Sequence, residues 1–147
     1  MAVLPEDLES FARLLVADER KRQIEKEGWT AEHDAWHGAQ VLAKAAHAYR
    51  TNQSSEWPWD LQWWKPKGRL RNLIRAGALY QAAADVSPVP PEVDFGPERP
   101  RTAPATRVDY EYMRDVTIRD LADLLIEAAA VFDRAADLLG AGTEETA

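Results

Sequence analysis

The chain has 147 residues, a formal net charge of -7, no cysteine and six tryptophans. This length suits a single domain with a sizeable core, and the absence of cysteine excludes disulfides, thiolate metal sites and thiol catalysis. The negative charge argues against general, sequence-independent DNA binding, which depends on basic residues that neutralise phosphates.

The N-terminal sequence MAVLPEDLES carries acids where a signal peptide has basic residues. No apolar run approaches the length that crosses a bilayer. We therefore expect a cytoplasmic protein that makes no membrane contact.

The first predicted helix begins near Pro5 and ends at Gly28. Proline is favoured in a first helical turn, and the acids Glu6 and Asp7 stabilise a helix N-terminus electrostatically. Apolar residues recur there at helical spacing, and the pattern predicts a buried face of Leu8, Phe11, Leu15 and Ile24.

The second predicted helix runs from Thr30, as N-cap, to about Arg50. On a helical wheel one face is small and apolar, and we expect it to be packed: Ala35, Ala39, Leu42, Ala46 and Tyr49. The opposite face is polar and carries His33, His37, Gln40, Lys44 and His47.

A tryptophan-rich segment, residues 56–68, contains Pro58, Pro66 and Gly68, so we expect an ordered loop there. A third helix is predicted from Arg69 to Ala84. The small run 76–78, Ala-Gly-Ala, predicts a close approach to the alanine face of the second helix, so that the two form a hairpin.

Six prolines between Ser87 and Pro104 predict an extended connector. For the last helix, Thr117 is the predicted N-cap with Asp120 in a capping box, Val116 and Leu121 form a hydrophobic staple, and Gly140 ends the helix. The segment 108–113 fits either a short strand or an extension of this helix. Its apolar stripe requires a partner, either the first three helices or a second copy of the chain.

These elements predict an all-α fold: a three- to four-helix bundle with a tryptophan-rich ordered loop and a proline-rich crossover before the last helix. The corresponding divisions are a helical core at 1–86, a linker at 87–107, a C-terminal amphipathic helix at 108–140 and a polar tail at 141–147.

One candidate for chemistry is the group of His33, Asp34 and His37. Two imidazoles four residues apart lie on the same helix face and can share one divalent metal, with Glu32 and Asp34 as candidate carboxylate ligands. The alternative is that the acids favour a helix N-terminus and the histidines are solvated or hydrogen-bonded.

The second candidate is the loop and the start of the third helix, where Trp57, Trp59, Trp63 and Trp64 precede Lys65, Lys67, Arg69, Arg71 and Arg75. Aromatic rings stack on bases and guanidinium groups bind phosphate, so this stretch predicts a site for a nucleotide or a single strand. In the alternative reading the tryptophans close the open end of a helical bundle and the basic residues balance an acidic protein.

A third candidate is acidic. All-α nucleoside triphosphate pyrophosphohydrolases hold Mg²⁺ with carboxylates on helices, and here Glu19, Glu27, Glu32 and Asp34 are available. Such enzymes need paired acids on two neighbouring helices, whereas the third helix offers only Asp85. Mg²⁺ or another divalent ion is therefore the cofactor that this alternative would require.

The stretches ERKRQIEKEGWTAEHD and WPWDLQWWKPKGRLRNLIRAGAL resemble a family of small uncharacterised proteins of tailed phages and prophages, over about residues 18 to 82. The family commonly has EHDD where this chain has EHDA, and an acid-rich end of the third helix where this chain has LYQAAADV. The resemblance implies a phage setting in a host cytoplasm, where small proteins take over host machinery or sequester nucleotide-derived signals, but it implies no reaction.

We therefore predict a binding module for a small anionic, nucleotide-like ligand or a host protein. The predicted ligand-binding residues are Trp63, Trp64, Lys65, Arg69, Arg71 and Arg75, with His33 and His37 at the rim. The alternatives are the Mg²⁺-dependent pyrophosphohydrolase and a structural protein that forms homo-oligomers through its C-terminal helix.

Overall fold

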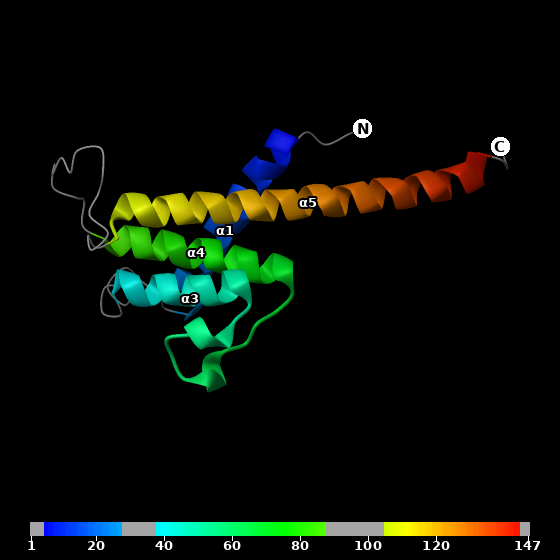
Figure 1. Cartoon of the computed structure of the whole chain (residues 1–147). Coiled ribbons are helices and arrows are strands. Elements are labelled where there is room, and N and C mark those ends of the chain that lie inside the picture. The colour runs from blue at the N-terminus through cyan, green and yellow to red at the C-terminus, as the bar shows by residue number, and fades with distance from the viewer. Residues whose placement is uncertain (1–4, 28–37, 88–104, 145–147) are drawn as a thin grey trace.

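The computed structural model describes residues 5–27, 38–87 and 105–144. In that part of the chain there are four α-helices and no strand: α1 (Pro5–Glu27), α3 (Ala39–Thr51), α4 (Arg69–Val86) and α5 (Arg107–Glu144). Helices α3, α4 and the first half of α5 lie side by side, and α1 crosses behind them (Figure 1). The predicted all-α bundle is confirmed.

Helix α1 has the predicted bounds, but its buried face differs from the predicted one. Phe11 and Ile24 are 47% and 39% exposed, whereas the buried side chains follow a neighbouring stripe that ends in polar residues: Ala12, Val16, Glu19, Arg20 and Gln23. The spacing of apolar residues did not predict this face, because two of its buried residues are charged. Glu19 and Arg20 can occupy core positions since each has a partner of opposite charge.

Helices α3 and α4 form the predicted hairpin and share one apolar cluster. Leu42, Ala46 and Tyr49 are buried, as the small face of the second helix predicts. The predicted start of that helix at Thr30, and Ala35 on its small face, lie outside the described residues.

The close approach predicted at the run 76–78 exists, but Gly77 makes it with a different helix. A Cβ atom built on Gly77 would lie 2.8 Å from Cγ2 of Val16, on α1 rather than α3. Real Cβ contacts are not this short, so the glycine lets α1 cross directly over α4.

The tryptophan loop is ordered by two short 3₁₀ turns, η1 (Ser54–Glu56) and η2 (Leu61–Trp63). The indole of Trp57 donates to the backbone carbonyl of Asp60. At the end of the loop, the Asn72 side chain exchanges hydrogen bonds with the backbone N–H and carbonyl of Lys67. An ordered loop was expected here.

Helix α5 begins at Arg107, ten residues before the predicted N-cap. Asp109 accepts hydrogen bonds from the backbone N–H and the hydroxyl of Thr106, immediately before the helix. Thr117 lies inside the helix and donates its hydroxyl to the carbonyl of Met113. The N-cap prediction was therefore wrong, and segment 108–113 is the helical extension rather than a strand.

Two further predictions for this helix were wrong. Asp120 accepts a hydrogen bond from Arg50 instead of joining a capping box. Gly140 does not end the helix, which continues to Glu144.

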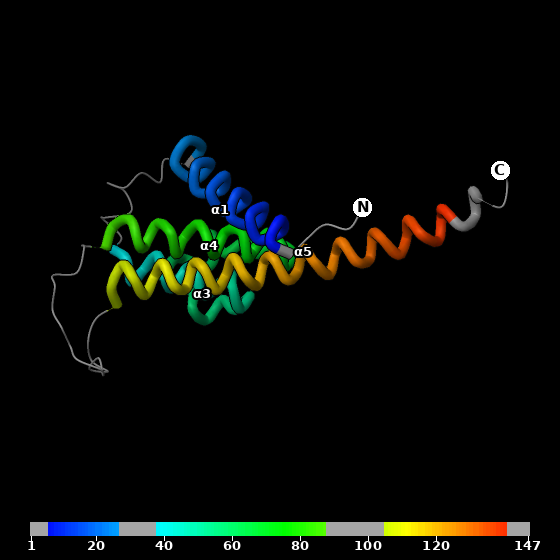
Figure 2. The backbone as a smooth tube through the Cα atoms, turned by 90° about the horizontal axis from the view of Figure 1, so that it is seen from above, coloured from blue at the N-terminus to red at the C-terminus, as the bar shows by residue number. Residues whose placement is uncertain are grey.

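The two halves of α5 have different environments. Tyr110, Ile118 and Leu121 are buried against α1, α3 and α4. Figure 2 shows the second half extending past the other helices, beyond the point where the N-terminal end of α1 meets α5. Neither this helix nor any other in the described ranges is long and apolar enough to span a bilayer.

Candidate functional site

The tryptophans of the predicted ligand site have unequal surroundings. Trp64 packs on Tyr49 and Trp57, with ring centroids 5.1 and 5.2 Å apart. Trp63, the other predicted stacking residue, is 60% exposed. Trp64 therefore packs against the end of the α3–α4 hairpin, whereas the Trp63 ring is exposed to solvent.

The basic residues of this predicted site contact the protein itself. Arg71 donates to a carboxylate oxygen of Glu19 at 2.7 Å, and Arg69 donates to the carbonyl of Arg50. Arg75 donates to the carbonyl of Lys65 at 3.1 Å and lies 5.6 Å above the Tyr49 ring. These contacts join α4 to α1, to α3 and to the tryptophan loop, and ligand binding at this surface stays a prediction.

Glu19 is the acid around which several of these arginines gather. Its side chain is 1% exposed, and Arg22 donates to both of its oxygens at 2.8 and 2.9 Å. Burial alone would raise the pKa of Glu19, but the hydrogen bond from Arg22 and the charges of Arg71, Arg22 and Arg75 outweigh it and hold the pKa below its ordinary value. Glu19 is therefore ionised at neutral pH and accepts hydrogen bonds from the guanidinium groups of Arg22 and Arg71.

This environment bears on the predicted Mg²⁺ site. Both oxygens of Glu19 already accept from guanidinium groups, and a cation there would meet three positive charges. His33, His37, Glu32 and Asp34 lie outside the described residues. Within the described residues there is no group of three or more histidines and acids that could hold a metal ion.

A different set of basic residues converges on one hollow between α1, α4 and α5. This hollow, the arginine pocket, has a volume of about 340 Å³. It is lined by Arg13, Val16, Ala17, Arg20, Gln81, Arg114 and Ile118. None of the described residues in this lining carries a carboxylate, and three of them are arginines.

Carboxylates outside the lining hold these guanidinium groups in place. Asp115 accepts from Arg13 at 3.2 Å and from Arg114 at 3.0 Å, and Asp85 lies 3.6 Å from Arg20. A guanidinium has five N–H donors, and the contacts of Arg114 to Asp115 and Gln81 involve three of them. The pocket thus presents oriented donors whose side chains are already ordered.

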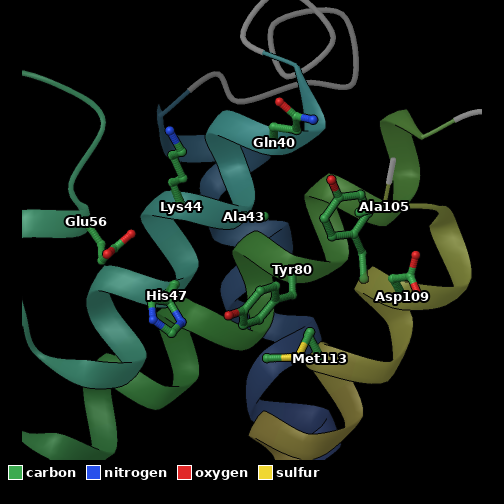
Figure 3. Close-up of a pocket in the computed structure, with 10 residues that line it drawn as sticks. Gln40, Ala43, Lys44, His47, Glu56, Tyr80, Ala105, Asp109 and Met113 are labelled. Carbon is green, nitrogen blue, oxygen red and sulfur yellow. The ribbon is translucent and has the colours of Figure 1, made fainter. Parts of the chain in front are cut away.

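A second hollow, of about 370 Å³, lies between α3, α4 and the start of α5 (Figure 3). Tyr80 and Met113 form much of its wall, and burial raises the pKa of Tyr80, so its phenol remains protonated at neutral pH. Charges of both signs surround it, with Lys44 opposed by Glu56 and Asp109. The charged residues lining this hollow are thus of both signs, whereas those lining the arginine pocket are all arginines.

Sequence reasoning did not single out Arg13, Arg20 or Arg114. Arg13 and Arg20 are seven residues apart, so their shared helix face was visible in the sequence. Arg114 is about one hundred residues away, and only the packing of α5 on α1 brings it to them.

Comparisons with models of protein families, with curated proteins and with solved structures gave no match. Functional assignment therefore depends on the geometry of these sites.

Proposed function

We propose that this protein binds a small phosphate-bearing anion, such as a nucleotide, in the arginine pocket. The observation that supports this most directly is that three arginines, two from α1 and one from α5, line one hollow whose described lining has no acid. The planar fork of a guanidinium matches two phosphate oxygens, and such charge-assisted hydrogen bonds are about twice as strong as neutral ones.

The remaining walls fit a ligand that is more than a bare ion. Val16, Ala17 and Ile118 offer apolar contact. The Gln81 amide accepts from Arg114 and donates one N–H to Asp85, which leaves its second N–H to donate to a polar edge. The volume of about 340 Å³ is at the lower end of small-molecule sites, which span about 300–1,000 Å³. A mononucleotide-sized ligand is therefore favoured over a polymer.

Guanidinium and amide groups bind and orient anions, so the proposed role is that of a binding module. The resemblance to small phage proteins would make a nucleotide-derived signal of the host a suitable ligand. This setting belongs to the proposal and is tested with it.

The experiment is calorimetric titration of the protein with nucleoside mono- and triphosphates, cyclic nucleotides and pyrophosphate, with sulfate as a simple anion. Arg13→Gln is the informative variant, because the Arg13 side chain is 48% exposed and its loss leaves the core intact. Losing one charge-assisted hydrogen bond should weaken binding about tenfold or more. Arg119→Gln removes the same charge from an exposed position of α5 outside the pocket, and it should leave affinity unchanged.

A complete lack of binding across this panel would exclude the proposal. The predicted site at the tryptophan loop is the alternative place for the same ligand, and Lys65→Gln tests it, because the Lys65 side chain is exposed and lies outside the arginine pocket. If Lys65→Gln weakens binding and Arg13→Gln does not, the ligand binds at the loop.

A further inference from the structure

The second half of α5 has an apolar surface that no described part of the chain covers. From Glu127 to Leu139 every side chain is exposed except that of Ala129, which is half-buried. Val131, Phe132, Leu138 and Leu139 are between 63% and 77% exposed. Figure 1 shows this half, in orange and red, running away from the other helices. We call residues 124–144 the α5 tail. Its first two residues, Leu124 and Leu125, also pack partly against α1 and α4.

The apolar residues of the tail follow a seven-residue repeat. Leu125, Phe132 and Leu139 occupy one core position, and Ala128 and Ala135 occupy the other. The flanking positions are also apolar: Leu124, Val131, Leu138, Ala129 and Ala136. Between residues 124 and 139 all four charged residues lie on the opposite side: Glu127, Asp133, Arg134 and Asp137. The tail therefore has one broad face without charge, the pattern of a helix that packs along another helix.

We propose that this face pairs with the tail of a second copy of the chain, with the two helices antiparallel. In an antiparallel pair, each residue of one core position faces a residue of the other core position. Phe132 then faces Ala135 of the second copy, and Leu139 faces Ala128. Every layer combines one large and one small side chain, so the two helices interdigitate without a void or a clash.

A parallel pair fits the same sequence poorly. It would place Phe132 against Phe132 and Ala135 against Ala135, so that crowded layers would alternate with hollow ones. The seven-residue repeat also continues backward through Leu121 and Ile118, where α1 and α4 of the same chain already cover it. A parallel partner helix would have to occupy that space, whereas an antiparallel partner meets only the tail (Figure 2).

The size of the contact is at the threshold for a specific interface. An overlap from about residue 125 to residue 142 is about 27 Å long. Pairing two helix faces of this length buries on the order of 1,000 Å², the area at which biological interfaces begin. We therefore expect a dimer that dissociates on dilution.

The mass of the full chain in solution tests the pairing. At about 100 µM, light scattering after size-exclusion chromatography should give twice the chain mass of 16.5 kDa, and the value should fall on dilution. Phe132→Asp should give the mass of a single chain. The thermal melting of the body, by which we mean α1, α3, α4 and the first half of α5, should be unchanged, because Phe132 is 74% exposed. A wild-type monomer at this concentration, a larger assembly, or a dimer that survives Phe132→Asp would overturn the proposal.

Orientation is tested by disulfide formation, since the chain has no cysteine of its own. Two differently tagged variants, Ala128→Cys and Leu139→Cys, are mixed and oxidised. The antiparallel pair predicts a disulfide that joins one variant to the other. In the antiparallel pair, two copies of the same variant would place their cysteines about 16 Å apart along the helix axis. This is too far for a disulfide, so only a bond between the two different variants can form. If most disulfides instead join two copies of the same variant, the pair is parallel.

A second variant separates the two orientations without cross-linking. Ala135→Leu fills the small position that faces Phe132 in the antiparallel pair, and it should weaken the dimer about tenfold or more through overpacking. In a parallel pair the same change fills a hollow layer and would strengthen association, which would contradict the proposal.

Discussion

A single buried carboxylate organises much of the charge between α1 and α4. Glu19 accepts from Arg22 on its own helix and from Arg71 on α4, so one acid joins two helices through two guanidinium groups. The pKa of Glu19 lies below its ordinary value of 4.5 although burial opposes this. Ionised Glu19 therefore stabilises the folded chain.

We expect Glu19→Gln to destabilise the fold by about 2 kcal/mol. This is less than the cost of about 3–5 kcal/mol for breaking a fully buried ion pair, because Arg22 and Arg71 remain partly in water. A group whose pKa is depressed by folding contributes its stability above its unfolded pKa and loses it as pH falls through the folded value. The difference in the free energy of unfolding between wild type and Glu19→Gln should thus have its full size at pH 7 and should shrink below about pH 4.5. Denaturant unfolding at several pH values measures it; a difference independent of pH would contradict this role.

Among the elements, the crossing of α1 over α4 depends on a residue without a side chain. Val16 Cγ2 would lie 2.8 Å from a Cβ atom at position 77, and Val16 is stiff and 3% exposed. The two helices pack at this distance only because residue 77 is glycine.

Gly77→Ala should therefore destabilise the protein by about 1–2 kcal/mol, since overpacking outweighs the gain in helix propensity of about 1 kcal/mol. Val16→Ala removes the colliding methyl groups, so in that background Gly77→Ala should cost nothing or stabilise. Thermal melts of the two single variants and the double variant measure this coupling. Equal costs in both backgrounds would exclude a direct contact between residues 16 and 77.

The helices also show how far local patterns predict this fold. Proline, glycine and apolar spacing were sufficient for the bounds of α1 and α4 and for the α3–α4 hairpin. The start of α5 was misplaced because Thr117 and Asp120 satisfy the spacing of a capping box as well as Thr106 and Asp109 do. Local spacing cannot choose between two such pairs, whereas the packing of Tyr110 against α3 and α4 does.

The candidate site was harder to predict because it depends on long-range partners. The tryptophan and arginine stretch predicted a surface site, but Arg71 and Arg75 contact Glu19 and the Lys65 carbonyl. Those acceptors lie on other segments and could not be read from the spacing. Another long-range contact, the packing of α5 on α1, brings Arg114 to Arg13 and Arg20.

At the scale of the whole molecule, the arginine pocket and the α5 tail are separate units on one helix. The pocket uses residues of α5 up to Ile118, whereas the face proposed for pairing begins near Leu124. A dimer with antiparallel tails would hold its two bodies at opposite ends, so each pocket would stay open to solvent. Two ligands would bind one dimer without contacting each other.

This separation predicts that ligand binding and self-association are uncoupled. Phe132→Asp should reduce the mass to that of one chain and leave affinity for the anion within about twofold, because sites without shared partners act additively. Conversely, saturating ligand should not change the dimer dissociation constant, since linkage is reciprocal. Titrating the same ligand into wild type and Phe132→Asp, with light scattering at zero and saturating ligand, measures both directions. If the monomeric variant bound ligand about tenfold more weakly, the pocket would require the second copy, and the two units would form one site.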